Sequence, residues 1–258
     1  MERFISISHY NEDQLYWIEL NRPDTYNAFS DEMMDEIKAA LKKAEALSDV
    51  RVVVFSGKGK VFASGADIKE LNEMSPLEAL FPRMQSLYDF IYKFPKPTVA
   101  AIDGYALGGG MELAAACDIR IATARSKFGM PECKLGVIPG AGGTQRLVKL
   151  IGEVKVKELV FLGEMIDGAE AKSIGFINFL SEESELQERA VNIAKRIAEK
   201  APMALRFAKE CIQRQADIPQ EVGMLLENLS QAYLFSTRDK KEGVTAFIEK
   251  RKPSFTGY

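Results

Sequence analysis

Short runs of apolar residues separated by polar turns are the main pattern in the first half of the chain. Runs of about five residues rich in valine and isoleucine are typical of buried strands, whereas apolar residues three and four positions apart are typical of helices. The runs at 4–7 and 15–20 flank a polar turn, which predicts a hairpin. Further strands are predicted at 51–57, 98–102 and 118–123.

Helical patterns lie between and after these strands. Ser30 is a candidate N-cap for an amphipathic helix to about Ser48, and Ser75 precedes a proline that starts a second helix to about Phe94. From Thr144 onward the chain is predicted to be mostly helical, with one strand at 176–180. The predicted helices there are 145–151, 154–162, 169–173, 185–200, 202–215 and 222–235. The last of them are rich in apolar residues, which suggests packing on the core or a subunit interface.

The order of these elements indicates an α/β fold. Strand, turn and helix recur in weak form around Val52, Val99 and Ile119, which favours stacked strand and helix turns over a Rossmann sheet. A G-x-G-x-x-G sequence after the first strand and a Walker motif are both missing from the sequence. The sequence therefore predicts no nucleotide-cofactor site.

Composition narrows the class of protein further. The 258 residues, 47% hydrophobic and 28% charged, are typical of a globular protein with a sizeable core. The net charge of −3 gives no general attraction to nucleic acid or to an anionic membrane. The apolar stretch at 98–116 contains Asp103 and Glu112, so we interpret it as core and not as a membrane span.

The cysteines and the single histidine exclude several kinds of site. Cys117, Cys133 and Cys211 are widely separated, so neither a disulfide framework nor a zinc site is predicted, and a cytoplasmic location is expected. His9 lies in the N-terminal strand pattern, away from the other motifs. A Ser-His-Asp mechanism and a histidine-based metal site are therefore not predicted.

The segment Gly104 to Asp118 opens with glycines and continues as an apolar helix. Three successive glycines, 108 to 110, allow the backbone to approach a ligand closely. The first amides of a helix lack a carbonyl partner and carry the positive end of its dipole, so they suit an oxygen that gains negative charge. Glu112 follows among core residues, which predicts a partly desolvated carboxylate.

A second carboxylate and two further loops complete the candidate chemistry. Glu132 ends the sequence Phe128-Gly-Met-Pro-Glu132, and a glycine loop follows at 138–147. Two carboxylates near such amides allow one to deprotonate water while the other gives a proton to carbon. The loop 61–69 combines small residues with Lys69, which suits a phosphate, although composition alone favours an ordinary surface lysine.

Five motifs in this order resemble those of the crotonase, or enoyl-CoA hydratase/isomerase, superfamily. They lie at 62–70, 104–112, 128–132, 138–147 and 242–252. The resemblance extends from about residue 21 to the tail. It implies a crotonase-like spiral of ββα turns in residues 1–195 and a helical oligomerisation segment in residues 196–258. It also implies a homotrimer or a homohexamer made of two trimers.

The resemblance implies an enoyl-CoA hydratase, a hydro-lyase of fatty acid or amino acid breakdown. By this similarity the amides of Ala66 and Gly109 form the oxyanion hole for the thioester carbonyl. Glu112 then positions and deprotonates the water, and Glu132 delivers a proton to C2. The other implied acyl-CoA-binding positions are Ser64, Asp67, Ile68, Lys69, Gly140, Phe247 and Lys250. Coenzyme A is part of the substrate, and neither a separate cofactor nor a metal is implied.

Several alternatives stay open at this point. Residues 201–209 and 236–240 resemble a branch that hydrates methylglutaconyl-CoA, whose second carboxylate would need a cation that the sequence does not identify. Relatives lacking one glutamate run other reactions, so the presence of both favours hydration over an enoyl-CoA isomerase. It also disfavours a catalytically idle scaffold protein. One branch binds RNA through a lysine-rich first helix, but here that helix is mixed in charge.

Overall fold

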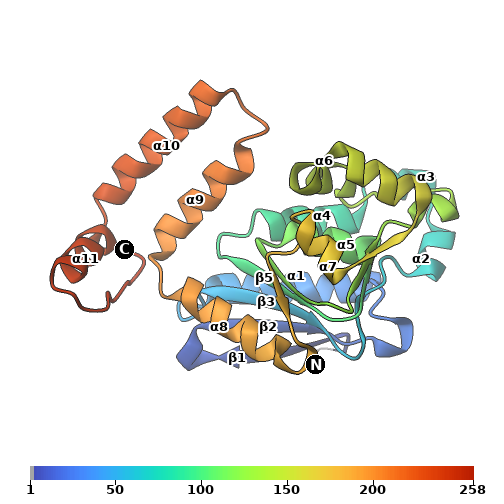
Figure 1. Ribbon diagram of the computed structural model, residues 1–258, viewed down its shortest axis with the longest axis horizontal. Coiled ribbons are helices and arrows are strands. Elements are labelled where there is room, and N and C mark those ends of the chain that lie inside the picture. Colours follow the sequence, from blue (N-terminus) through green and yellow to red (C-terminus); the bar gives the residue numbers. More distant parts are fainter. Residues whose placement is uncertain (1–2) are drawn as a thin grey trace.

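Two stacked β-sheets form the centre of the molecule, whose computed structural model describes residues 3–258 (Figure 1). Met1 and Glu2, at the start of the predicted core domain, lie outside the described residues. The larger sheet has the order β1-β2-β3-β5-β7-β10 and the smaller one the order β4-β6-β8-β9. The strands of the larger sheet are β1 (Ile5–Tyr10), β2 (Leu15–Leu20), β3 (Val52–Gly57), β5 (Thr98–Ile102), β7 (Ile119–Thr123) and β10 (Phe179–Ser181). Those of the smaller sheet are β4 (Val61–Ala63), β6 (Tyr105–Leu107), β8 (Lys127–Gly129) and β9 (Met165–Asp167).

The chain alternates between the two sheets as it advances. After β3 and β4 come the helices α2 to α4, after β5 and β6 comes α5, and after β7 and β8 comes α6. Strands from successive turns pair in parallel, β3 with β5 and β5 with β7 in one sheet, β4 with β6 and β6 with β8 in the other. Each turn therefore adds one strand to each sheet and one helical layer, and the predicted spiral of ββα turns is confirmed.

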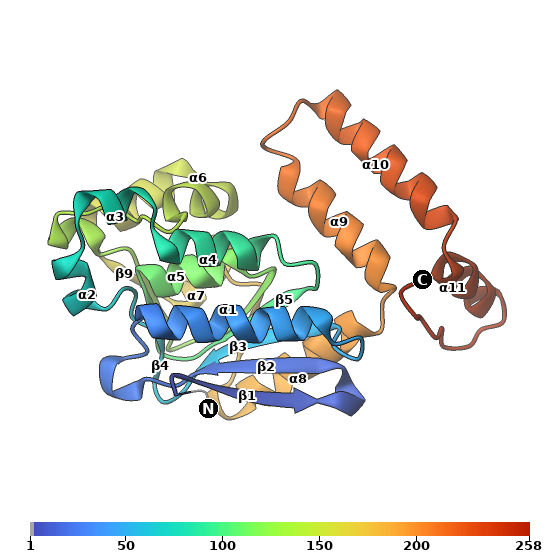
Figure 2. The same ribbon diagram turned by 180° about the vertical axis from the view of Figure 1, so that it is seen from behind.

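Helices cover both faces of the larger sheet (Figure 2). The helices of the core are α1 (Asp31–Ala46), α2 (Ile68–Glu73), α3 (Pro76–Leu80), α4 (Arg83–Tyr92), α5 (Gly109–Ala116), α6 (Gly143–Leu162), α7 (Gly168–Ser173) and α8 (Leu186–Ala198). Short 3₁₀ turns lie at Asn11–Asp13, Pro23–Thr25, Glu132–Leu135 and Glu183–Glu185.

Because helices cover both faces of the larger sheet, its central strands are uninterrupted apolar runs. Val53 and Phe55 of β3 belong to the main core, whereas Val52 and Val54 pack with Ala190 and other α8 residues on the opposite face. Because both faces of these parallel strands are buried, no alternation of apolar and polar residues is required.

Four features differ from the sequence-based expectations. The single helix predicted from residue 75 to 94 is wrong, because the chain breaks at Phe81 and Pro82 between α3 and α4. Proline has no N–H group and disfavours the helical conformation of the residue before it. The strand predicted at 176–180 begins later, at Phe179. The short strands of the smaller sheet were not predicted, and neither were the helices α2 and α11.

The C-terminal helices α9 (Pro202–Arg214), α10 (Gln220–Phe235) and α11 (Arg238–Ile248) extend away from the two sheets (Figure 1). The predicted boundary at 195/196 falls inside α8, which still packs on the larger sheet. Helices α9 and α10 contact each other, for example through the rings of Phe207 and Tyr233, whose centroids are 5.3 Å apart. Within residues 3–258 no helix has the length and apolar composition needed to cross a membrane.

Candidate active site

Helix α5 carries the first candidate carboxylate into the interior. It begins at Gly109, directly after β6, and Glu112 in its first turn is only 2% exposed. The helix lies against β4 at backbone distance, since a methyl group added to Gly110 would lie 2.1 Å from the Ala63 carbonyl oxygen. The glycines therefore allow α5 to sit in the layer between the smaller sheet and α4 and α6, which both contact it.

The Glu112 carboxylate is fixed by the second glycine loop. Its Oε1 accepts hydrogen bonds from the amides of Ala141, at 2.9 Å, and Gly143, at 2.7 Å. Burial raises the pKa of Glu112, while these two amides and the nearby charge of Arg146 oppose the rise. The same contacts hold the carboxylate in one orientation with its second oxygen left for another partner.

Glu132 lies in a different environment. Both of its carboxylate oxygens are buried, and within the described part of the chain neither has a hydrogen-bond partner. The carboxylate lies beside the start of α5, since a methyl group on Gly108 would be 3.0 Å from Glu132 Oε1. Burial and the neighbouring Glu112 charge raise the pKa of Glu132 to about 7. Near neutral pH this carboxyl group can therefore both hold and release a proton.

The loop after β4 reaches the start of α5. A methyl group on Gly65 would lie 3.1 Å from the Gly109 nitrogen, so the loop after β4 contacts the first residue of the helix. The Gly65 carbonyl and the Asp67 amide bond to Phe29, at 2.8 and 3.0 Å, which fixes the peptide units around Ala66. The amides of Ala66 and Gly109 themselves have no acceptor among residues 3–258. Amides without an acceptor are the kind of donor that an oxyanion requires, and the assignment of these two to an oxyanion hole stays a prediction.

The sequence model of the enoyl-CoA hydratase/isomerase family matches residues 11–258. The chain belongs to this family. A probable mitochondrial enoyl-CoA hydratase of Arabidopsis thaliana is 41% identical over 243 residues, 93% of this chain and 81% of the relative. A probable enoyl-CoA hydratase of Mycobacterium leprae is 41% identical over 239 residues, 93% of each chain. The crystal structure of enoyl-CoA hydratase from Bacillus anthracis has a TM-score of 0.93 at 36% identity, covering 99% of this chain and 100% of that one.

In this member of the hydratase/isomerase family, four of the predicted site residues come together. Ala66, Gly109, Glu112 and Glu132 arrive from the loop after β4, the start of α5 and the turn after β8. Gly140 is exposed and directly precedes Ala141, one of the two residues whose amides hold Glu112. The catalytic roles assigned to these residues remain predictions.

The remaining predicted positions are more dispersed. Asp67 accepts hydrogen bonds from Arg22, at 3.0 Å, and from the Lys69 amide, at 3.1 Å. Its carboxylate therefore caps the N-terminus of α2. Ser64 Oγ lies 3.5 Å from the Thr25 carbonyl oxygen. The predicted contacts Ile68 and Lys69 are exposed at the start of α2.

Phe247 and Lys250 are not brought to the site within one chain. Phe247 is 84% exposed near the end of α11, and Lys250 follows that helix with a φ of 54°. Helix α11 and helix α2 lie at opposite ends of the molecule (Figure 1). Any contact of these two residues with a ligand at Glu112 would have to come from another copy of the chain.

Helix α4 contributes site residues that the sequence did not indicate. A methyl group on Gly109 would lie 2.7 Å from the Met84 sulfur, so Met84 packs against the start of α5. One turn later, Tyr88 is fully buried, and burial and the charge of Glu112 raise the pKa of its hydroxyl. The α4 sequence has an ordinary helical pattern, and only the packing of α4 on α5 reveals this contact.

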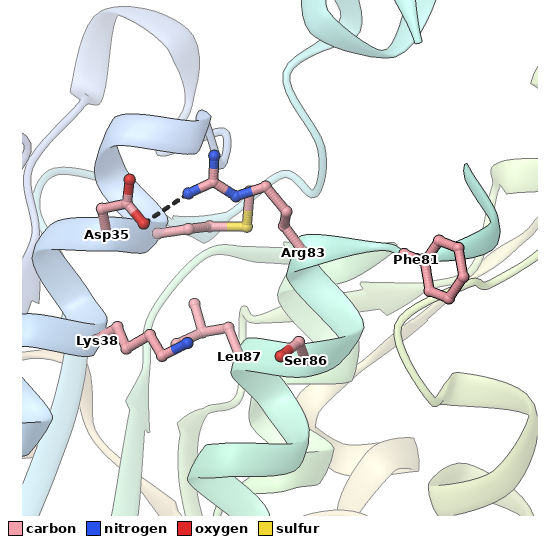
Figure 3. A pocket seen from close by; sticks show the side chains of 7 residues that line it. Asp35, Lys38, Phe81, Arg83, Ser86 and Leu87 are labelled. Atoms are coloured by element: carbon pink, nitrogen blue, oxygen red, sulfur yellow. Dashed lines mark hydrogen bonds and ion pairs between the residues drawn. The ribbon is translucent and has the colours of Figure 1, made fainter. Parts of the chain in front are cut away.

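A separate cavity of about 190 Å³ lies between α1 and α4 (Figure 3). Its lining residues are Met34, Asp35, Lys38, Phe81, Arg83, Ser86 and Leu87. The Arg83 guanidinium points toward α1, where it pairs with Asp31 at 2.7 Å and with Asp35 (Figure 3). Neither glutamate of the candidate site lines this cavity.

The raised pKa of Glu132 predicts a pH-dependent stability. A carboxyl group whose pKa rises from 4.5 to about 7 on folding binds its proton more tightly in the folded state. Its stabilising contribution is full below pH 4.5 and is lost as the pH rises through 7. Above pH 7 we expect Glu132→Gln to have a larger free energy of unfolding than the native chain, by roughly 2 kcal/mol.

Denaturant unfolding at pH 5 and pH 8 measures this difference. The matched control is Glu188→Gln, because Glu188 is an exposed glutamate on α8. The advantage of Glu132→Gln should be larger at pH 8 than at pH 5. If the difference in free energy of unfolding between Glu132→Gln and the native chain is the same at both pH values, folding does not raise the pKa of Glu132.

Proposed function

We propose that this protein is an enoyl-CoA hydratase, which adds water across the 2,3 double bond of a 2-enoyl-CoA thioester to give a 3-hydroxyacyl-CoA. The observation that carries the proposal is the pair of unlike carboxyl groups beside two unpartnered amides. Glu112 is held by two amide donors, whereas Glu132 has none and has a pKa of about 7. The family membership and the hydratase names of the relatives support the same reaction.

In the proposed reaction the thioester oxygen accepts hydrogen bonds from the amides of Ala66 and Gly109. This polarises the conjugated system and makes C3 electrophilic. Glu112 removes a proton from water as the oxygen bonds to C3, and the π electrons move onto the thioester oxygen as an enolate. The protonated Glu132 then gives its proton to C2. Proton exchange between the carboxyl groups and solvent restores the starting state.

Coenzyme A enters this scheme as part of the substrate. We propose that Ile68 and Lys69 lie along its path, because both are exposed at the start of α2 beside the Ala66 amide. The ammonium group of Lys69 suits a phosphate of the coenzyme. Ser64 and Asp67 then shape the same loop through their bonds to the Thr25 carbonyl and to Arg22.

We propose a neutral acyl group over an acidic one such as methylglutaconyl. A second substrate carboxylate would need a free cation near the acyl group. The guanidinium of Arg146 near Glu112 is bonded to the Ala141 carbonyl and lies 3.4 Å from Asp89, and that of Arg83 is paired with two α1 aspartates. Met84 of α4, which packs against the start of α5, offers an apolar contact instead.

The test is loss of the conjugated enoyl-thioester absorbance with crotonyl-CoA and with 3-methylglutaconyl-CoA as separate substrates. We expect the kcat/KM for crotonyl-CoA to be at least about 10²-fold higher, since an unpaired buried charge on the acidic substrate is strongly disfavoured. A higher kcat/KM for 3-methylglutaconyl-CoA would instead assign the protein to the branch of the family that hydrates this acidic substrate. If neither substrate is consumed, the hydratase proposal is wrong.

We also propose a homotrimer or homohexamer, assembled through the C-terminal helices. Apolar side chains on α10 are left exposed in the single chain, among them Met224, Leu225, Leu229, Tyr233 and Phe235. Burying them against other copies would also allow Phe247 and Lys250 to approach a neighbouring site. A mass by sedimentation of three or six times 28.7 kDa is expected, and a monomer at micromolar concentration would contradict the proposal.

A cytoplasmic location and the lack of a nucleic-acid partner are proposed on sequence grounds. All three cysteines are free, which suits a reducing compartment. The three lysines of α1 share that helix with five acidic residues, so the helix carries no net positive charge.

A further inference from the structure

The orientation of Glu112 depends on three successive peptide units in the glycine loop. The N–H groups of Ala141 and Gly143 bind Glu112 Oε1. The peptide unit between them carries the Ala141 carbonyl, which accepts a hydrogen bond at 2.8 Å from Arg146 Nη1. Whatever fixes this central peptide also fixes the two amides on either side of it.

Arg146 occupies the space that a side chain at residue 142 would need. A methyl group on Gly142 would lie 2.0 Å from Arg146 Nη1, and the φ of Gly142 is +102°, in the region that favours glycine. The Arg146 side chain is only 11% exposed. The guanidinium therefore packs directly on the loop as a brace.

Helix α4 holds this brace from the other side. Asp89 Oδ1 lies 3.4 Å from Arg146 Nη2, and the Tyr92 ring lies under the guanidinium, 5.2 Å from ring centroid to Cζ. Arg146 itself is in the first turn of α6. One planar group thus connects α4, α6 and the loop, which suits the fork of donors in arginine and not the single ammonium of lysine.

We propose that Arg146 is a positioning residue of the reaction, which holds the Ala141–Gly143 loop so that its two amides keep Glu112 aimed at the water. This inference rests on the proposed hydration. Arg146 does not touch the reacting atoms, and it acts through the backbone of the loop. Asp89 and Tyr92 belong to the same arrangement because they fix the guanidinium.

The charge of Arg146 adds a second, measurable effect. The ionisable groups that interact with the charge of Glu112 are Glu132 after β8, Tyr88 on α4 and Arg146 on α6. Of these, only the guanidinium is positive, and it lowers the pKa of Glu112 against the effect of burial. Removing it should raise that pKa in addition to loosening the loop.

The experiment compares native enzyme, Arg146→Gln, Arg146→Lys and the control Lys157→Gln. Lys157 is in the same helix, in an exposed ion pair with Glu153. For Arg146→Gln we expect kcat for crotonyl-CoA to fall by about 10- to 100-fold with KM within about twofold, since a small misplacement of a catalytic group is costly. The acidic limb of its pH profile should move to higher pH. Lys157→Gln should match the native enzyme.

Arg146→Lys separates the two effects. A lysine keeps the positive charge but cannot bind the Ala141 carbonyl and Asp89 in a planar fork. It should restore the native pH limb while recovering only part of kcat. The proposal is overturned if Arg146→Gln keeps the native kcat and the native pH profile. It is also overturned if the activity of this variant falls only in proportion to the fraction of unfolded protein.

Two further measurements keep the test decisive. If Arg146→Gln does not fold, Asp89→Asn loosens the brace and leaves its charge, and we expect a lower kcat with an unchanged pH limb. Infrared difference titration of the Glu112 carboxylate, assigned with Glu112→Gln, measures its pKa without turnover. A raised Glu112 pKa in folded Arg146→Gln, with the native value in Arg146→Lys, would show independently of turnover that the Arg146 charge acts on Glu112. An unchanged pKa in Arg146→Gln would contradict the proposed place of the guanidinium beside the loop, whereas the positioning role itself is tested by the kcat values.

Discussion

Glu112→Gln is expected to lower the kcat for crotonyl-CoA hydration by about 10³-fold, since general-base catalysis contributes on the order of 10²–10⁴. The amide oxygen of glutamine can still accept the bonds from Ala141 and Gly143, so the loop should stay in place. What is lost is the base that takes the proton of water. Stopped-flow or steady-state loss of enoyl absorbance measures the effect.

The exposed α8 variant Glu188→Gln serves as the matched control and should keep native kcat. Circular dichroism should show a native fold for both variants. A folded Glu112→Gln enzyme with kcat within tenfold of the native value would remove Glu112 from the proposed base role. In that case Glu132, with its pKa of about 7, would become the candidate for both proton transfers.

Gly110→Ala is expected to destabilise the fold by about 3 kcal/mol or more, because it forces the backbone of α5 away from β4. The added methyl group would lie 2.1 Å from the Ala63 carbonyl oxygen and 2.7 Å from its carbonyl carbon. Both contacts are with backbone atoms that cannot rotate away. Helix propensity alone predicts the opposite sign, a gain of about 1 kcal/mol for alanine over glycine.

Gly223→Ala provides the comparison, since Gly223 also lies in a helix, α10, and a methyl group there would be 3.9 Å from the Ile218 side chain. We expect that control to be neutral or stabilising by up to about 1 kcal/mol. Urea unfolding of the two variants measures the difference. A neutral Gly110→Ala would mean that α5 and β4 are not in backbone contact. The variant should also lose activity, because the Gly109 amide moves with the helix.

Local patterns along the chain were sufficient for most of the architecture. The apolar runs at 51–57 and 98–102 became central strands, and the N-cap predicted at Ser30 accepts a hydrogen bond from Met33. These features depend on contacts between near neighbours in sequence, which periodicity and capping residues report directly. The break at Pro82 also has a local cause, because proline disrupts a helix. The prediction of one helix across residue 82 gave this effect too little weight.

Sequence patterns predicted the residues of the candidate site but not the environment of each residue. Motif order predicted Glu112 and Glu132 as the acid pair and the amides of Ala66 and Gly109 as the oxyanion hole, and these roles stay predictions. The different environments of the two carboxyl groups were not predictable, because the pKa of Glu132 depends on burial and on a carboxylate 20 positions earlier. The distance between α11 and α2 likewise follows from how the C-terminal helices leave the sheets (Figure 1).

The sequence by itself determined most strands of the larger sheet, most of the long helices, the family, and the chemical groups available for the reaction. Only the tertiary structure decided which amides hold Glu112, which helix braces their loop, and which predicted residues a single chain can bring together. The physical reason is that hydrogen bonds and burial at the site join segments far apart in sequence, such as Arg146 with Asp89 and Glu112 with Gly143. Periodicity carries no information about such pairs.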